Sequence, residues 1–274
     1  MNRPEIRNLA LSLVCLVIVI LLASVVLPPI LGYDWRVVFR PAALATIEGQ
    51  NPYQVDQFMI APWSLLLFVP LALLPERVGL AFLTVVGLLV YALVAIRLGT
   101  RRAGLVAILL SPQVLQCLIN GNIDWLALAG FVMPAQIGLF FLALKPQIGA
   151  ALMVYWALEA IREKRFWYTF FPFIVVLGIS FTLFGFWPLS MANVSQEQSV
   201  SMWPLSLPFG LVLLFAAIRR RRERLAQGIS PLIAPHVMFH SWAAPLFALA
   251  PDTLELIAAV VVSWLAFVWI LIAR

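Results

Sequence analysis

The sequence has few charged residues and few of the residues that build active sites in soluble proteins. Only 11% of its 274 residues are charged, whereas 64% are hydrophobic, and it holds two cysteines and two histidines. It contains no glycine-rich phosphate loop, no G-x-S-x-G nucleophile motif and no cysteine-histidine cluster with metal-ligand spacing. These absences exclude the usual soluble-enzyme templates. The high hydrophobic fraction and the low charged fraction indicate an integral membrane protein, and the lack of metal-ligand spacing predicts no metal site.

The excess of basic residues has a pattern that separates two classes of protein. The net charge of +6 comes from short basic clusters between long apolar runs. Nucleic-acid-binding proteins gather such charge on one surface, whereas membrane proteins keep it in cytoplasmic loops. The pattern therefore favours membrane orientation and predicts no nucleic-acid partner.

Long apolar runs predict most of the membrane crossings. A helix needs about 20 apolar residues to cross the hydrocarbon layer. The first run follows a basic start and is too long for a cleaved signal peptide, so we expect an uncleaved helix. Clear spans are predicted at residues 9–31, 79–96, 104–119, 166–186, 204–218, 230–250 and 253–273.

Two shorter stretches need other arguments. Residues 61–75 contain Pro62, Pro70 and Pro75 and are too short for a span, so they predict an interfacial hairpin inside an outer loop, 32–78. The stretch from Asp124 to Lys145 is long enough for about one crossing. If it instead enters and returns as two half-helices hinged at Pro134, 14 of the 18 basic residues lie in the cytoplasm rather than 6.

We take the second arrangement, since broken helices at membrane depth occur where they line a cavity. The sequence therefore predicts one all-α, polytopic membrane domain, 1–274, with about ten transmembrane helices or half-helices. Both termini are expected in the cytoplasm, and the chemistry is expected on the outer side.

A few polar residues near predicted outer helix ends could carry chemistry. Asp34 follows the first helix and could act as a general base, with Arg36 and Arg40 nearby to hold phosphate. The alternative is an interfacial Asp–Arg pair, and Lys145 could equally be a lysine that extends to the interface. His236 and His240 are four residues apart, so we expect them on one helix face, as packing or site residues.

The order of these residues resembles that of the GT-C membrane glycosyltransferases, especially family 87, which use polyprenyl-phosphate-mannose. The similar motifs are an Asp after the first helix, a G-x-N-P-Y turn, a proline-bounded apolar hairpin, a G-Q-x-N tip, a K-P-Q turn and a late Ser-Pro helix with histidine. They match Asp34, Gly49 with Asn51–Pro52–Tyr53, residues 62–75, Gly121–Asn122–Ile123–Asp124, Lys145–Pro146–Gln147, and Ser230–Pro231 with His236 and His240. The tip departs from the family pattern at Asn122 and Asp124, and the chain is shorter than most members.

The resemblance implies a GT-C-like fold and an inverting transfer of a sugar from a polyprenyl-phosphate donor to an acceptor hydroxyl at the outer membrane face. Asp34 would be the catalytic base, while Lys145, Arg36 and Arg40 would bind the donor phosphate. No cofactor is expected. Substrate-binding roles would fall to Asn51, Tyr53, Asn122, Asp124, Gln147, His236 and His240.

Two alternatives stay open from sequence. A non-catalytic relative could serve as a structural subunit of a larger membrane complex, with other membrane subunits as partners. A transporter or lipid-binding membrane protein would also use broken helices, but with polar residues at mid-depth. In each case we expect membrane lipids around the chain, in a bacterial or archaeal plasma membrane.

Overall fold

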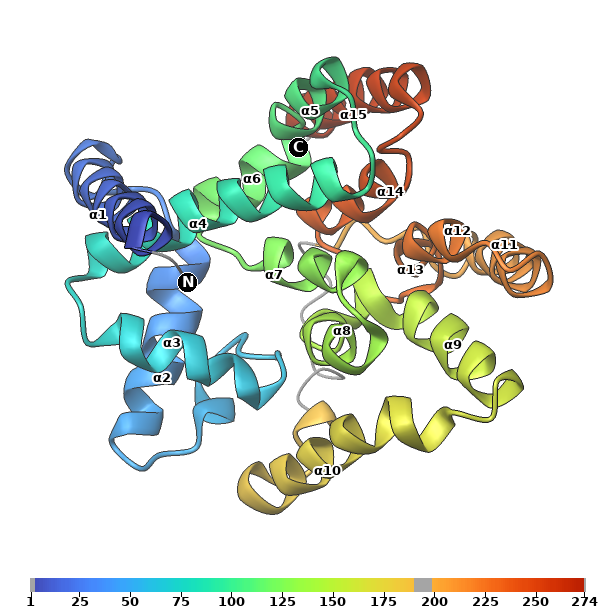
Figure 1. Cartoon of the computed structure of the whole chain (residues 1–274), viewed down its shortest axis with the longest axis horizontal. Helices are drawn as coiled ribbons and strands as arrows, with labels where there is room; N and C mark the ends of the chain where they lie inside the picture. The colour runs from blue at the N-terminus through green and yellow to red at the C-terminus, as the bar shows by residue number, and fades with distance from the viewer. Residues whose placement is uncertain (1–2, 190–198, 274) are drawn as a thin grey trace.

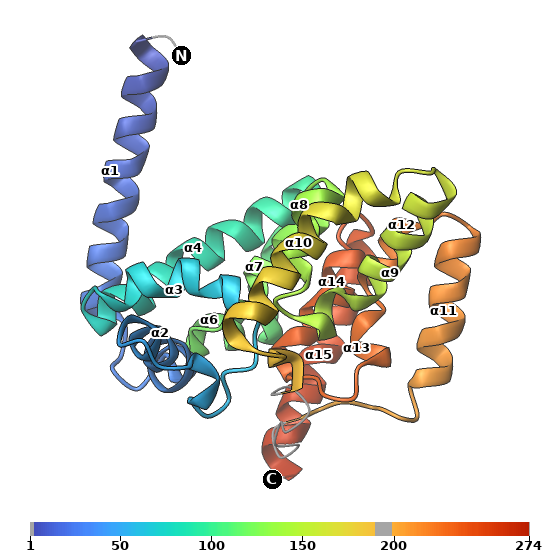
Figure 2. The same ribbon diagram turned by 90° about the horizontal axis from the view of Figure 1, so that it is seen from below.

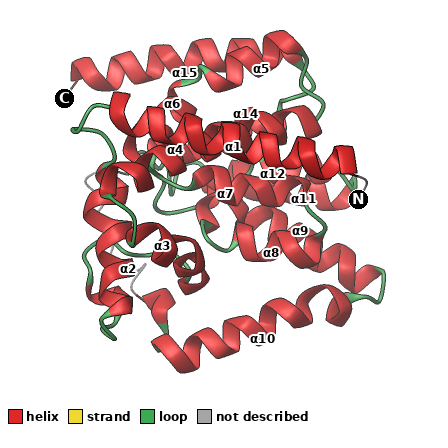
Figure 3. Cartoon of the chain, turned by 60° about the vertical axis from the view of Figure 1, so that its left-hand side comes forward, coloured by secondary structure: helices red, strands yellow, loops and turns green. Residues whose placement is uncertain are grey.

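The computed structural model describes residues 3–189 and 199–273, and every regular element among them is a helix (Figures 1 and 3). Asn193-Val194-Ser195, which has the sequence pattern of an N-glycosylation acceptor, lies outside these residues. Four helices are long and apolar enough to cross a membrane: α1 (Arg3–Val26), α4 (Glu76–Arg97), α10 (Phe166–Phe184) and α15 (Thr253–Ala273). A fifth crossing is possible through α5 (Arg102–Leu109) and α6 (Pro112–Asn120), which are bent by 48° relative to each other across the break at Leu110 and Ser111.

Helix α1 stands away from the body of the molecule and meets it mainly along α4 (Figure 2). Its apolar side chains, such as Leu13, Val17 and Leu22, are about half exposed. A helix that is apolar on all sides and lacks a protein cover matches lipid as its surroundings. At its end, the Gly32 amide donates to the Ile119 carbonyl oxygen at 2.8 Å, which ties this end of α1 to the end of α6.

The predicted outer loop is mostly helical. It forms η1 (Asp34–Phe39), α2 (Arg40–Ile47), η2 (Pro52–Gln54), η3 (Pro62–Ser64) and α3 (Leu65–Ala72). The predicted hairpin at 61–75 is wrong, because η3 and α3 form one short helix with Pro70 inside it. This helix packs on α2, and Phe39 stacks on Phe68 with ring centroids 4.6 Å apart.

The stretch from Asp124 to Lys145 turns back on itself, as predicted. It consists of α7 (Asp124–Ala129), η4 (Gly130–Val132) and α8 (Ala135–Leu142), with the break at Met133–Pro134. Its two ends meet, because Lys145 Nζ lies 3.3 Å from Asp124 Oδ1. A single crossing would hold these two residues on opposite sides, so the reversal is confirmed.

A second reversal occurs where the sequence predicts a span at 230–250. After α9 (Pro146–Arg162), α10 and the 13-residue α11 (Leu207–Arg219), the chain forms α12 (Glu223–Gln227), α13 (Ser230–Ile233), an extended segment 234–238, η6 (Phe239–Trp242) and α14 (Ala243–Ala248). A Cβ placed on Gly228 would lie 3.1 Å from Ala248 Cβ. The segment therefore turns back on itself, and the prediction of one span is wrong.

Prolines explain this error. Pro235 lacks an N–H and disfavours the helical conformation of Ala234 before it, and Pro245 follows ten residues later. Ala234 is indeed extended, with ψ of 132°. The helix that would have placed His236 and His240 on one face is therefore absent, and that prediction is also wrong. Likewise α11, predicted as a span at 204–218, is shorter than a crossing helix needs.

The two chain ends lie at opposite ends of the molecule (Figure 2). Helix α15 runs in the same direction as α5 and α6, since Leu256 lies beside Gly104 and Trp264 Nε1 donates to the Leu110 carbonyl at 3.1 Å. This course gives no support to the prediction that both termini share one side, which counted the returning segment 223–250 as a crossing.

Candidate functional site

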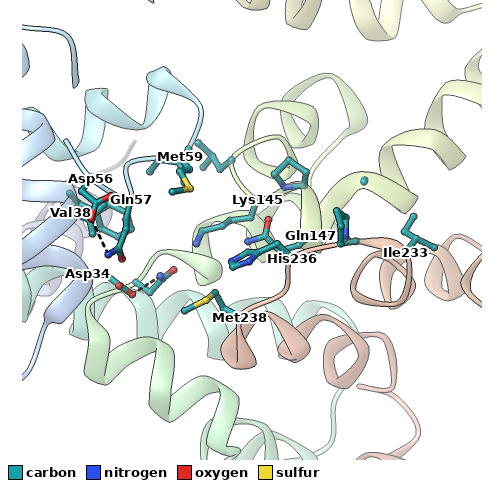
Figure 4. Close-up of a pocket in the computed structure, with 18 residues that line it drawn as sticks. Asp34, Val38, Asp56, Gln57, Met59, Lys145, Gln147, Ile233, His236 and Met238 are labelled. Atoms are coloured by element: carbon teal, nitrogen blue, oxygen red, sulfur yellow. Dashed lines mark hydrogen bonds between the residues drawn. The ribbon is translucent and has the colours of Figure 1, made fainter. Parts of the chain in front are cut away.

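A cavity of about 620 Å³ lies where four parts of the chain meet (Figure 4). They are the outer segment (residues 34–60), the reversals at 124–145 and 223–250, and the start of α9. Ligand pockets commonly have volumes of 300–1,000 Å³. One wall carries Asp34, Asp56 and Gln57, and the other carries Lys145, Gln147 and His236. Apolar side chains, among them Val38, Phe39, Met59, Leu144, Ile233 and Met238, complete the lining. The cavity thus separates carboxylates from a cation and has an apolar surface between them.

The Asp34 side chain is oriented by the tip between α6 and α7. Asn122 Nδ2 donates to Asp34 Oδ2 at 2.7 Å, while Asn122 Oδ1 accepts from the Ile123 amide. Gly121 ends α6 with φ of +66°, and a Cβ there would lie 3.0 Å from Leu80 and Trp35. Glycine is therefore needed to bring Asn122 to Asp34.

Lys145 stands at the beginning of α9, with its side chain in the cavity wall. It is buried, and its carbonyl oxygen accepts from the Ile148 and Gly149 amides. Pro146 and Gln147 form the first helical positions, and both line the cavity. The positive end of the helix dipole and the ammonium group thus act at one place, an arrangement that favours an anion.

His236 adds a neutral group beside Lys145. Burial lowers the pKa of His236, and the nearby Lys145 and His240 lower it further. Its Nδ1 has no hydrogen-bond partner among the described residues. At neutral pH the imidazole is uncharged, so it can donate one N–H to a bound anion.

Asp124 and His240 lie behind this wall and do not line the cavity. Asp124 is fully buried, and its Oδ2 lies 2.6 Å from His240 Nδ1 and accepts from Ser241 Oγ at 2.8 Å. Burial opposes ionisation of Asp124, but His240 and Lys145 together with the bonds from His240 and Ser241 lower its pKa overall. Neither side chain lines the cavity, so the cavity gives no support to the predicted substrate-binding roles of Asp124 and His240, which stay predictions.

The two predicted phosphate-binding arginines also lie outside the cavity lining. Arg36 Nε is 3.1 Å from Glu76 Oε1, and its guanidinium donates to the Pro29 carbonyl. Arg40 begins α2 and does not line the cavity either. The cavity therefore gives no support to a phosphate-binding role for Arg36 and Arg40, which stays a prediction.

Asn51 and Tyr53 shape the outer segment instead of lining the cavity. Asn51 Oδ1 accepts from the Tyr53 amide at the start of η2, and Tyr53 Oη donates to the Ile60 carbonyl at 2.8 Å. Tyr53 also stacks on Trp187. These bonds hold the backbone that carries Asp56 to Ile60, and the predicted substrate contacts of Asn51 and Tyr53 stay predictions.

Sequence reasoning missed Asp56, Gln57 and Ser241. Gln57 has φ of +62°, a backbone conformation that non-glycine residues rarely adopt, and it places the side chain in the cavity wall. The signal for Asp56 and Gln57 was their position shortly after the N-P-Y turn. Ser241 could have been noticed as a polar residue next to His240 in an apolar stretch.

Within residues 3–189 and 199–273, no group of three histidine, cysteine, aspartate or glutamate side chains could hold a metal ion. Comparison with protein-family models, with curated proteins and with solved structures gives no significant match for this chain. Function must therefore be argued from the cavity itself.

Proposed function

We propose that the chain is a membrane glycosyltransferase that transfers a sugar from a polyprenyl-phosphate donor to an acceptor hydroxyl, with inversion, at the outer face of a bacterial or archaeal plasma membrane. The observation that carries this proposal is the position of Asp34 and Lys145 on opposite walls of one cavity. Such a separation suits a displacement in which base and leaving group lie on opposite sides of the reacting carbon.

The two walls of the cavity have different roles in this reaction. Asp34 takes the proton of the acceptor hydroxyl as its oxygen attacks the anomeric carbon. The bond from that carbon to the phosphate oxygen breaks, and its electron pair leaves with the phosphate. Lys145 stabilises the released charge, together with the start of α9, Gln147 and neutral His236.

The apolar lining supports a lipid-linked donor. Leu144 and Pro235 line the cavity next to Lys145 and His236 in the chain, and Ile233 and Met238 are also part of its lining. A prenyl chain attached to the phosphate would gain free energy by covering these side chains. A soluble sugar nucleotide has no apolar chain that could cover these side chains.

The test compares Asp34→Asn with a matched control, Glu48→Gln. Glu48 is an exposed carboxylate after α2 that does not line the cavity. In membranes supplied with a polyprenyl-phosphate sugar, we expect kcat to fall by about 10²-fold or more in Asp34→Asn, since only the proton acceptor has gone. Glu48→Gln should stay within about twofold of wild type.

Donor binding is measured separately, because a base is not needed for it. Geranyl phosphate should protect Lys145 from acylation equally in wild type and in Asp34→Asn. Near-wild-type transfer by Asp34→Asn would reject Asp34 as the base.

A second candidate is a non-catalytic subunit of a larger membrane complex. It is favoured by one observation, that the Lys145 ammonium already has a buried carboxylate partner in Asp124. This candidate predicts no sugar transfer by wild type, no protection of Lys145 by geranyl phosphate, and stoichiometric co-purification with other membrane proteins.

A further inference from the structure

A buried polar cluster stands directly behind the cavity wall and joins three distant parts of the chain. Asp124 comes from the start of α7, Lys145 from the start of α9, and His240 with Ser241 from η6. Asp124, His240 and Ser241 are fully buried, whereas Lys145 also lines the cavity. Lys145 is therefore the member of the cluster through which it can act on a ligand.

Two side chains other than Lys145 hold the Asp124 carboxylate in place. Both His240 Nδ1 and Ser241 Oγ approach the same oxygen, Oδ2, at 2.6 and 2.8 Å. Its other oxygen, Oδ1, has no hydrogen bond among the described residues and faces the Lys145 ammonium at 3.3 Å. One carboxylate oxygen is therefore held by His240 and Ser241, and the other faces the ammonium group of Lys145.

From this division we infer that Asp124, held by His240 and Ser241, is a positioning residue that keeps the Lys145 ammonium charged and fixed at the cavity wall. A lysine side chain has four rotatable bonds and loses considerable entropy when held in one place. A buried carboxylate offsets both this loss and the cost of burying the charge. The inference rests on the proposed function in one respect, namely that the ligand bound by Lys145 is the phosphate of the donor.

The chain offers an internal reference for testing the cluster. Its only two lysines are Lys145 and Lys164. Lys164 is exposed, between α9 and α10. Acylation with acetic anhydride at a series of pH values, followed by mass spectrometry of the two peptides, gives the midpoint pH at which each amine becomes reactive.

Asp124→Asn keeps the size of the side chain and removes its charge. We expect the Lys145 midpoint to fall by about one pH unit or more, because a poorly solvated ammonium loses its counter-charge, while the Lys164 midpoint stays unchanged. Ser241→Ala should lower the Lys145 midpoint less, since His240 still holds Asp124. An unchanged Lys145 midpoint in Asp124→Asn would overturn the inference.

Transfer kinetics supply a second readout. Asp124→Asn should raise the KM for the polyprenyl-phosphate donor by about tenfold and leave the acceptor KM within about twofold. A fall in kcat is also expected, since Lys145 stabilises the leaving phosphate, whereas an unchanged kcat together with an unchanged donor KM would count against positioning. If wild type transfers no sugar, the proposed function fails, but the acylation midpoints still decide whether Asp124 controls Lys145.

Discussion

Asn122 and Asp34, 88 positions apart in the chain, are joined by a 2.7 Å hydrogen bond from the Asn122 amide to a carboxylate oxygen. The Oδ1 of the same amide accepts from the Ile123 backbone at 2.6 Å, so the side chain is held at both ends. Asn122 can therefore orient one oxygen of Asp34 and leave the other for a substrate hydroxyl.

The first prediction concerns this pair. Asn122→Asp would place two carboxylates within hydrogen-bond distance, and such a pair holds a shared proton over part of the pH range. We expect transfer at pH 7 to fall by about tenfold or more, and the acidic limb of the kcat profile to move to higher pH. Asn122→Ala should lower kcat without moving that limb as far. Equal profiles for the two variants would show that charge at this position has no influence on the base.

A second prediction follows from His236. Its pKa is lowered in the folded protein, so protonation favours the unfolded state and its contribution to stability falls as pH drops below about 6.5. A bound anion should reverse this preference, because protonated His236 would add positive charge next to Lys145.

Protection of Lys145 by geranyl phosphate should therefore need less ligand at pH 5.5 than at pH 7 in wild type, by about threefold or more. The His236→Gln variant should lose this dependence while still binding at pH 7. A pH dependence that survives in His236→Gln would assign the effect to another group.

The third prediction uses the two lysines to test sidedness. Arg162, next to Lys164, donates to the Ile218 carbonyl, which gathers the basic turns at 162–165 and 219–224 at one end, away from the cavity. An impermeant sulfonated succinimidyl ester applied to intact cells should modify Lys145 and not Lys164. In inside-out vesicles the preference should reverse. Modification of both lysines from one side would contradict the arrangement.

The fourth prediction concerns the contact beneath Asp34. A Cβ on Gly79 would lie 2.4 Å from the ring of buried Trp35, whereas a Cβ on Gly178 would meet nothing within 4 Å. Gly79→Ala should lower the stability of the detergent-purified protein by about 1–3 kcal/mol, because Trp35 must move. Gly178→Ala in α10 should be neutral or slightly stabilising. Thermal unfolding followed by tryptophan fluorescence measures both.

Sequence reasoning succeeded where one physical rule was dominant. Hydrophobic length located α1, α4, α10 and α15, and the distribution of basic residues favoured the reversal between Asp124 and Lys145. It failed at 230–250, because average hydropathy there is compatible with a span and the local effect of Pro235 was given too little weight. That single error also put His236 and His240 on one helix face and counted segment 223–250 as a crossing.

The site was only partly predictable, because the sequence does not show which distant segments come into contact. Asp34, Asn122, Lys145, Gln147 and His236 all line one cavity. The first four lie near helix ends or turns that the sequence suggested, whereas His236 was predicted inside a span. Whether a polar residue faces a cavity or stands behind its wall depends on contacts between distant segments. Asp124 and His240, 116 positions apart, could not be recognised as partners from spacing along the chain.

The return of segment 223–250 to the cavity also sets an order of events during synthesis. Chains grow at about 5–20 residues per second, so Asp124, which lies 116 positions before His240, is made roughly 6–23 seconds before His240. During this interval its carboxylate has Lys145 as an available partner but neither of the two donors that later hold it. The cavity is therefore completed among the last steps of biogenesis, and a ribosome that stops before residue 240 releases a chain with most of its crossings and an unfinished centre.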